Sequence, residues 1–552
     1  MAQTHRPRPD NSAPEKLSRE YLSLGVWQPY SLSDCWDHNA HRDPKGMAVS
    51  DGERALSWAE SKTWTDRVAL GLIKLGVARD AVLLAQLPNC LEVVLIRVAC
   101  EKAGVLCLPA PRTWRKKELG YTLGYTKAQA VVVPAQYRDV DYFGMIRELQ
   151  AGSPQLRHVL LPAKEVPQGA RSLAELASFP REEKISRAAL ERRRYRATEV
   201  SLVNATTGST GLPKFAEYAA AARLLYGRAY INNMRLTHDD VLAALSPAAA
   251  GPNIPIYFAA PQVGAKVVVL GHFEARAAFE LIEQEKVTIA CGVPAQFAMM
   301  VREPHLDHFN LSSVRFWLSV GAPLPSTLAR EIEEKLGGIV LNCYGAADWG
   351  GVVFTSPDDP PEARYFTVGK PWVGTEVRIV DEEGRACGAR EVGGLEGRGP
   401  ACSFGYYRDP EATRAAWRSD GWMGLGDLAC WGQGGNVIVV GRKRDTIIRG
   451  GQNIEPSEIE NYLLDHPKVQ QVAVVGVPDP IMGERVCVYV VPRPNEGVTL
   501  EEIGSFLASK QIAPYKIPER LVVAEKLPML ADTKVDRSAL KAAIAGTRVR
   551  KP

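Results

Sequence analysis

The sequence predicts an α/β protein with a large N-terminal domain, built from two doubly wound α/β lobes and a small β-barrel lobe, followed by a small C-terminal α+β domain. Apolar helices and short apolar strands alternate over most of the first 345 residues. Glycine then becomes frequent between residues 350 and 440, and a charged stretch after Gly441 precedes a new set of helices and strands. Strands that alternate with helices of this length favour a mostly parallel sheet.

The first lobe is predicted from two successive helix and strand pairs. Apolar residues recur at helical spacing over 66–76, and the apolar run 81–87 indicates a buried strand. Residues 88–104 repeat the helical pattern up to a closing glycine, and the run 105–108 follows as the next strand. Two further short strands are predicted at 131–133 and 158–161.

The later lobes are predicted from the same kind of pattern. Between about residues 200 and 345, apolar runs indicate strands at 266–270, 287–290 and 314–320. Frequent glycines between 393 and 435, including Gly393, Gly394, Gly397, Gly399, Gly434 and Gly435, favour short strands in a barrel-like β region. In the last hundred residues, helices are predicted at 456–464 and 500–507, with strands at 469–475 and 486–491. The polar residues 1–19 are expected to be a flexible tail, before a core that spans 20–441.

Composition excludes several classes of protein. The chain has 552 residues, with 67 Lys plus Arg against 63 Asp plus Glu, so its net charge of +4 implies no surface-wide field for nucleic acid or an anionic membrane. Ten cysteines occur without a Cys-x-x-Cys pair, which indicates reduced thiols and a cytoplasmic protein without a zinc cluster. The charge-free stretch 241–265 contains four prolines, so we expect buried loop and strand there rather than a membrane span.

The most informative segment is a glycine and hydroxyl loop that directly follows the strand-like run 200–204. Glycines let backbone N–H groups approach an anion, hydroxyls add donors, and a lysine adds positive charge, so the loop is typical of phosphate binding. It has neither the common P-loop spacing nor the dinucleotide fingerprint. The alternative is a surface turn without function. The candidate phosphate-binding residues are Thr206, Thr207, Gly208, Ser209, Thr210, Gly211 and Lys214.

This loop resembles the phosphate loop of the adenylate-forming superfamily, which includes acyl-CoA synthetases, aryl-acid-activating enzymes and the adenylation domains of peptide synthetases. Five further segments resemble motifs of that superfamily in the same order, so the resemblance covers residues from about 20 to 540. It implies that Gly321, Ala322 and Pro323 line the adenine pocket. Within the segment 344–348, it implies that the Tyr344 ring flanks the adenine, that Gly345 belongs to the nucleotide site, and that Asp348 helps to hold Mg²⁺.

The remaining motifs imply the ribose site and a mobile C-terminal domain. By resemblance, Asp427 accepts hydrogen bonds from both ribose hydroxyls, as suits a carboxylate beside a vicinal diol, and Arg442 also contacts the ribose. Residues 442–446 resemble the interdomain hinge, with Arg444 as the pivot, and 447–545 resemble the mobile domain. Two further roles are implied within that domain: Gly450 and Gly451 lie beside the acceptor thiol, and Lys534 is the adenylation lysine.

The resemblance therefore implies an ATP-dependent acid:CoA ligase. A carboxylic acid attacks the α-phosphorus of ATP, pyrophosphate leaves, and a thiol of coenzyme A then displaces AMP from the acyl adenylate. Lys534, Lys214 and Asp348 are the expected catalytic residues, with Mg²⁺ held by Asp348. The expected partners are a small carboxylic acid and coenzyme A, with no nucleic acid and no membrane.

Two alternatives remain open. A stand-alone adenylating enzyme would load its acid onto the phosphopantetheine arm of a carrier protein by the same thiol chemistry. A degenerate nucleotide-binding protein without turnover is suggested by five departures from the motifs, each of which removes a hydroxyl, shortens an acid or replaces a glycine. These departures are Ala347, Asp348, Leu425, Leu530 and Thr533.

The acyl pocket is the least readable part of the sequence. Ala249 and Ala250 stand where many members of the superfamily place a histidine or an aromatic residue, which predicts a small apolar wall. In the dihydroxybenzoate-activating members, which this chain also resembles, an asparagine follows that histidine; Gly251 stands there instead, which argues against a 2-hydroxybenzoate. Ala347 and Trp349 are further candidates, and a flat Trp349 wall favours an aromatic or alicyclic acid. The alternative for Trp349 is ordinary core packing. The sequence does not identify the acid or the oligomeric state.

Overall fold

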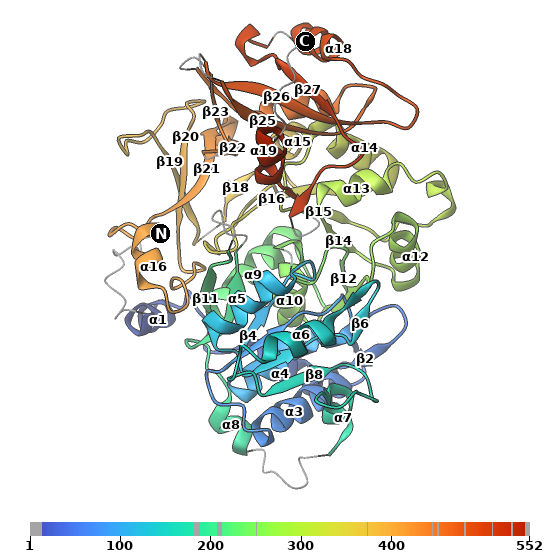
Figure 1. The fold of residues 1–552 in the computed structure, drawn as a ribbon. Helices are drawn as coiled ribbons and strands as arrows, with labels where there is room; N and C mark the ends of the chain where they lie inside the picture. The colour runs from blue at the N-terminus through green and yellow to red at the C-terminus, as the bar shows by residue number, and fades with distance from the viewer. Residues whose placement is uncertain are drawn as a thin grey trace.

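The structure is a computed structural model that describes residues 14–180, 188–206, 212–249, 251–372, 374–443, 445–449, 452–479, 482–510, 512–530 and 534–546. Its described residues form two large sheets covered by helices, a four-stranded sheet, and a separate C-terminal sheet, shown in red in Figure 1. The predicted α/β class, with parallel sheets in a large N-terminal part and a distinct C-terminal part, is confirmed.

The first sheet has seven strands in the order β11-β10-β4-β3-β5-β8-β9. Its strands are β3 (Val82–Ala85), β4 (Leu106–Pro109), β5 (Ala130–Val132), β8 (His158–Leu161), β9 (Arg171–Ser172), β10 (Val200–Ala205) and β11 (Phe215–Ala219). The helices of this region are α2 (Leu32–Arg42), α3 (Trp58–Lys74), α4 (Leu91–Ala103), α5 (Lys116–Thr126), α6 (Tyr142–Gln150), α7 (Leu173–Ser178) and α8 (Ala188–Arg193), with the short hairpin β6 (Gln136–Tyr137) and β7 (Val140–Asp141). Both predicted helix and strand pairs are present, and α4 ends at Gly104, whose left-handed φ of +65° favours glycine.

The second sheet has nine strands in the order β18-β17-β16-β15-β14-β12-β13-β1-β2. Its strands are β1 (Met47–Ser50), β2 (Ala55–Ser57), β12 (Val241–Ala244), β13 (Lys266–Val269), β14 (Ile289–Gly292), β15 (Phe316–Val320), β16 (Ile339–Tyr344), β17 (Val353–Phe354) and β18 (Lys370–Pro371). The helices of this region are α9 (Ala220–Met234), α10 (Ile254–Phe258), α11 (Ala260–Val263), α12 (Ala275–Glu285), α13 (Pro294–Met300), α14 (Ser326–Leu336) and α15 (Pro361–Phe366).

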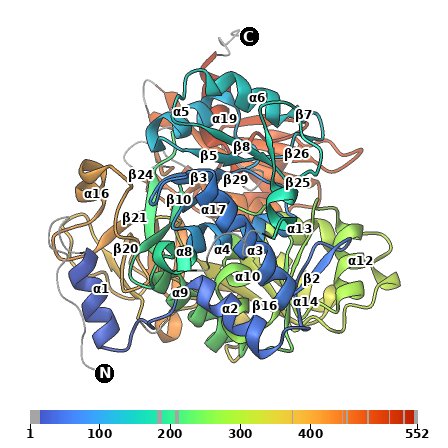
Figure 2. The ribbon, with the colours of Figure 1, turned by 90° about the horizontal axis from the view of Figure 1, so that it is seen from below.

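Strand exchange between the lobes was not predicted. Strand β1 pairs in parallel with β13, so a segment near the N-terminus completes the second sheet. Conversely, β10 pairs with β4 and with β11, so residues 200–205 and 215–219 belong to the first sheet rather than to the second lobe, where we expected them. Figure 2 shows α3, α4 and α10 between the two sheets, where apolar residues from both lobes form one core cluster.

The glycine-rich region, for which a small barrel was expected, is a four-stranded antiparallel sheet in the order β19-β20-β21-β22. Its strands are β19 (Glu376–Val380), β20 (Gly393–Arg398), β21 (Met423–Trp431) and β22 (Val437–Arg442), with helix α16 (Pro410–Ala416) between β20 and β21. In the part of the chain that the structure describes, β19 and β22 form the two ends of this sheet.

The C-terminal region has its own sheet, in the order β24-β23-β26-β25 with β27 beside β26, and its own apolar clusters. Its elements are β23 (Ile447–Arg449), β24 (Gln452–Ile454), α17 (Pro456–Leu464), β25 (Val469–Asp479), β26 (Gly483–Pro492), α18 (Leu500–Ser509), β27 (Arg520–Val523), β28 (Met529–Leu530), β29 (Lys534–Val535) and α19 (Arg537–Gly546). The predicted helix 456–464 has the observed bounds.

Two local expectations differ from the structure. Residues 14–19 of the expected flexible tail lie in helix α1 (Pro14–Ser23), while 1–13 lie outside the described residues. The stretch 241–265 forms β12 and then the short helices α10 and α11, because prolines are tolerated in the first turn of a helix. Within the described ranges, no helix combines the length and the apolar character needed to cross a bilayer.

Candidate active site

The expected adenine-pocket residues lie at the carboxyl ends of two neighbouring parallel strands. β15 ends at Val320, immediately before Gly321, and β16 ends at Tyr344. Gly321 has a φ of +96°, a conformation that L side chains rarely adopt, so the turn that leaves β15 requires glycine. In open α/β sheets, ligands bind beyond the carboxyl ends of the strands. The structure therefore brings 321–323 and 344–345 to one edge of the second sheet.

Three residues from separate motifs meet at Asp427. This carboxylate, on β21, accepts a hydrogen bond from the Tyr344 hydroxyl and lies 3.1 Å from the Arg442 Nε atom on the adjacent strand β22. Asp427 is only 5% exposed. Burial, and then the negative Asp427, raise the pKa of the Tyr344 phenol, so this phenol remains a hydrogen-bond donor at neutral pH. Three of the residues expected to hold the nucleoside thus form one connected group.

A second group surrounds Asp348. Its Oδ2 atom accepts a hydrogen bond of 2.6 Å from the Tyr406 hydroxyl, and the Lys214 ammonium lies 4.9 Å from the centre of the Tyr406 ring. The Asp348 backbone carbonyl accepts a further 2.6 Å bond from the Ser403 hydroxyl. Tyr406 thus links the two expected catalytic residues Lys214 and Asp348. Sequence reasoning missed it, because a tyrosine outside the recognised motifs carries no signal for this contact.

The residues at Asp348 fit a magnesium ion in one respect. Among the described residues, no group of three His, Cys, Asp or Glu side chains could hold a metal ion. Mg²⁺ in nucleotide sites commonly takes one or two carboxylates, and the phosphates and water complete its coordination. A single acid that Tyr406 links to Lys214 fits that pattern. Asp348 is therefore the residue that would hold the ion, with its remaining ligands supplied by ATP and solvent.

The base of the glycine and hydroxyl loop is a hairpin between β10 and β11. The Thr206 N–H donates to the Lys214 carbonyl at 2.8 Å, and the Lys214 N–H donates to the Thr206 hydroxyl at 3.3 Å. These bonds close a loop at the edge of the first sheet. Five predicted phosphate-binding residues lie outside the described residues: Thr207, Gly208, Ser209, Thr210 and Gly211.

The C-terminal candidates are only partly described. Lys534 lies on β29, where it pairs with Leu530 of β28, within the segment that resembles the last motif. Arg444, Gly450 and Gly451 lie outside the described residues.

The expected acyl-pocket residues have different environments. Ala249 and Gly251 are exposed at the start of the segment that enters α10, Ala347 is exposed beside Asp348, and Ala250 lies outside the described residues. Trp349 is 0% exposed, and a side chain added at Gly351 or Gly397 would collide with its indole. Its indole faces are covered by the protein, as in core packing, so Trp349 presents no wall to a cavity. This corrects the interpretation that favoured a flat Trp349 wall.

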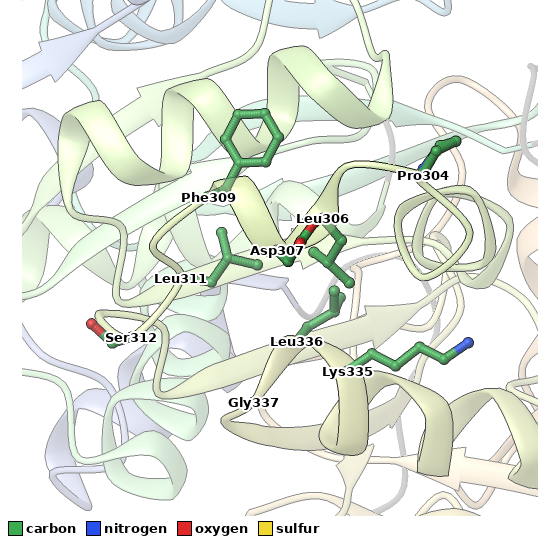
Figure 3. Close-up of a pocket in the computed structure, with 9 residues that line it drawn as sticks. All are labelled: Pro304, Leu306, Asp307, Phe309, Leu311, Ser312, Lys335, Leu336 and Gly337. Atoms are coloured by element: carbon green, nitrogen blue, oxygen red, sulfur yellow. The ribbon is translucent and has the colours of Figure 1, made fainter.

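One cavity of about 470 Å³ lies elsewhere, as Figure 3 shows. It is lined by Pro304, Leu306, Asp307, Phe309, Leu311, Ser312, Lys335, Leu336 and Gly337. Leu311 and Gly337 precede the first residues of β15 and β16, so the cavity lies at the amino ends of these strands, opposite the candidate active site. We assign it no catalytic role.

Comparison with known proteins defines the class of this protein. Residues 36–407 match the family model described as AMP-binding enzyme, and residues 458–534 match the model of the AMP-binding enzyme C-terminal domain. The chain therefore belongs to the AMP-binding enzyme family and is an adenylate-forming ligase. This confirms the resemblance drawn from the motifs.

Curated relatives cover nearly the whole chain. A 2-hydroxy-7-methoxy-5-methyl-1-naphthoate–CoA ligase from Streptomyces carzinostaticus is 33% identical over 96% of both chains. A medium-chain fatty-acid–CoA ligase from Escherichia coli is 30% identical, over 96% of this chain and 93% of that one. A 2,3-dihydroxybenzoate-AMP ligase from Bacillus subtilis is also 30% identical, over 96% and 97% respectively.

Solved structures agree with the fold. ATP-bound MatB from Rhodopseudomonas palustris is 25% identical with a TM-score of 0.82, over 93% of this chain and 99% of that chain. The apo structure of MbtA from Mycobacterium smegmatis is 28% identical with a TM-score of 0.71, over 98% of both chains. The relatives thus include both CoA ligases and AMP ligases.

Proposed function

We propose that this protein is an ATP-dependent acid:CoA ligase that forms an acyl adenylate and then a CoA thioester, on an aromatic or alicyclic acid. With Trp349 in the core, support for an aromatic acid comes from the naphthoate–CoA ligase among the relatives. The observation that carries the proposal is the group of Tyr344, Asp427 and Arg442, in which residues from separate motifs share one buried carboxylate. A nucleoside held there would direct its phosphates toward the loop that begins at Thr206. Asp348 and Lys214 are the charged side chains joined by Tyr406 in the same part of the protein.

The proposed first half-reaction is attack by the acid's carboxylate oxygen on the α-phosphorus of ATP. The new P–O bond forms as the bond to pyrophosphate breaks, so negative charge grows on the phosphoryl oxygens and the leaving group. Lys214, the loop hydroxyls and Lys534 would stabilise this charge with donors and positive charge. Mg²⁺, when bound, offsets the repulsion between phosphate oxygens.

The proposed second half-reaction needs a different arrangement of the C-terminal region. After pyrophosphate leaves, Lys534 would withdraw, and the backbone around Gly450 and Gly451 would line a path for the pantetheine thiol. The thiolate then attacks the acyl carbon, AMP leaves with the bond electrons, and a thioester remains. Rotation of a small domain about a short segment, here 442–446 with Arg444 as pivot, is an ordinary way to exchange catalytic groups.

A second candidate is an adenylating enzyme that loads a carrier protein. The 2,3-dihydroxybenzoate-AMP ligase among the relatives favours it, while the two CoA ligases favour coenzyme A. Both candidates share the first half-reaction. They differ in the surface that receives the acceptor.

The decisive experiment has two stages. Acid-dependent exchange of labelled pyrophosphate into ATP, over benzoates, cyclohexane carboxylates and medium-chain acids, tests adenylation. If none of these acids supports exchange, the result would favour the degenerate nucleotide-binding protein. For each active acid, coenzyme A and a holo carrier protein are then compared as acceptors, and release of AMP only with the carrier would reject the CoA ligase.

A further inference from the structure

Arg223, on the first turn of α9, is a buried cation with unused hydrogen-bond donors. Arg223 is 2% exposed. Its guanidinium lies over three aromatic rings, at 4.3 Å from the ring centre of Tyr218, 4.4 Å from that of Tyr226 and 5.7 Å from that of Phe258. Its Nε and Nη2 atoms have no hydrogen-bond partner among the described residues.

The aromatic rings satisfy this cation only in part. A ring attracts the positive charge through its face, while the guanidinium N–H donors point outward in the guanidinium plane. A buried charge whose donors lack acceptors is costly, and such groups in native proteins are usually paired. The planar fork of an arginine matches a carboxylate, which accepts two parallel N–H bonds. One guanidinium donor also interacts with the Tyr218 hydroxyl, and the two donors that remain, Nε and Nη2, suit an oxygen anion.

Two ring neighbours of Arg223 connect it to the two segments expected to line the acyl pocket. Tyr218 donates a 2.7 Å hydrogen bond to the Ala347 carbonyl, one residue before Asp348. Phe258 ends α10, the helix that follows the Ala249 to Gly251 segment, and α10 packs so closely on α9 that a side chain at Gly227 would meet the Phe258 carbonyl at 2.1 Å.

Tyr226, whose ring also contacts the Arg223 guanidinium, lies near the end of β16. A side chain added at Gly345 would meet the Tyr226 hydroxyl at 3.1 Å, so Arg223 and Tyr226 flank the end of β16 from the α9 side. Burial is the main cause of the raised pKa of the Tyr218 phenol. Arg223 lowers this pKa and Asp348 raises it, so both charges act on the same phenol. Arg223 thus adjoins the acid-binding side of the proposed active site.

We propose that Arg223 is a specificity-determining residue that binds a second carboxylate on the acid substrate, at the end away from the reacting carboxyl. The protein would then prefer aromatic or alicyclic dicarboxylic acids over monocarboxylic acids of the same shape. This inference rests on the proposed function, because it concerns the acid that is adenylated.

The test compares isosteric acids on three proteins. Benzene-1,3- and 1,4-dicarboxylate are compared with 3- and 4-nitrobenzoate, in which a neutral nitro group replaces the second carboxylate. The wild type, Arg223→Met and Arg223→Lys are assayed by pyrophosphate exchange for kcat/KM, and by calorimetry for binding of each acid without turnover. Arg235→Met is the matched control, because Arg235 follows the last residue of the same helix and pairs with Asp358 at the exposed surface.

We expect the wild type and Arg235→Met to prefer the diacid by about tenfold or more, because an unpaired buried charge is the alternative. Arg223→Met should abolish or reverse that ratio while it keeps exchange with the nitro acid, and Arg223→Lys should retain part of the preference. Equal use of both acids by the wild type, or an equal loss for both acids in Arg223→Met, would overturn the inference while adenylation stands. If no acid supports exchange, the proposed function fails, and calorimetry then tests the role of Arg223 by itself. Diacid binding that is lost in Arg223→Met but kept in Arg235→Met supports that role. Absence of diacid binding to the wild type rejects it.

Discussion

Replacing Tyr344 with phenylalanine tests whether the nucleoside competes with the protein for Asp427. The Asp427 carboxylate is bonded to the Tyr344 hydroxyl and paired with Arg442. A hydrogen bond to a charged group contributes about 1.5 to 3 kcal/mol, so Tyr344→Phe should lower the free energy of unfolding by roughly that amount. The free carboxylate should then accept the ribose hydroxyls without first losing the tyrosine.

The assay is calorimetric ATP binding, with thermal or denaturant unfolding measured on the same samples. We expect Tyr344→Phe to be less stable but to bind ATP at least as tightly as the wild type. Asp427→Asn is the comparison: it should weaken ATP binding by roughly 10 to 100-fold, since one bond to a charged group is lost and about 1.4 kcal/mol corresponds to tenfold. If Tyr344→Phe weakens ATP binding as much as Asp427→Asn does, the tyrosine hydroxyl assists the nucleotide, and the competition argument is wrong.

Three further predictions concern separate groups. Lys534→Ala should slow adenylation by about 10² to 10³-fold, as removal of one donor at a charged transition state does, while thioester formation from a preformed adenylate persists; equal loss in both half-reactions would contradict the proposed role. Tyr406→Phe removes the hydroxyl that orients Asp348, so the Mg²⁺ concentration for half-maximal pyrophosphate exchange should rise about tenfold or more, and an unchanged value would argue against Asp348 as the ligand. Burial raises the pKa of Glu217 to about 7, with Arg408 as a smaller opposing cause, so the unfolded chain ionises first and stability should fall as pH rises from about 4.5 through 7, by on the order of 3 kcal/mol. Glu217→Gln should flatten this part of the stability profile, and a wild-type profile that rises over the same range would show the opposite sign.

Local patterns in the sequence predicted the elements well, because they depend on neighbouring residues. The helix 456–464 and the strand 158–161 have the predicted bounds, and Gly104 ends α4 as expected. The pairing of β1 with β13 was not predictable in this way. Their partners are more than 200 residues apart, so the pairing depends on how whole lobes pack.

In the candidate site too, residues within motifs were predictable, whereas the burial of individual side chains was not. The motifs were sufficient to predict that Asp427 and Arg442 belong to one ribose site, and the structure places them on adjacent strands. The sequence could not decide between pocket and core for Trp349, because its burial depends on Gly351 and Gly397, which approach the indole closely in the fold. Arg223 was missed for a related reason: an arginine in a helical pattern is usually on a solvated face, and only the packing of α10 against α9 buries it.

The position of Arg442 connects the ribose site to the C-terminal region. Arg442 ends β22, and its guanidinium contacts Asp427 in the core. A few residues later, the Thr446 hydroxyl donates to Glu455 at 2.6 Å, and the Ser457 hydroxyl donates back to the carbonyl of Val440 on β22. Any rotation about residues 442–446 must break the bond between Ser457 and Val440, because it joins α17 to the core strand. A nucleotide that takes over Asp427 changes the partner of Arg442, at the residue where the proposed hinge begins. Binding of ATP and the position of the C-terminal region are therefore expected to depend on each other through this single carboxylate.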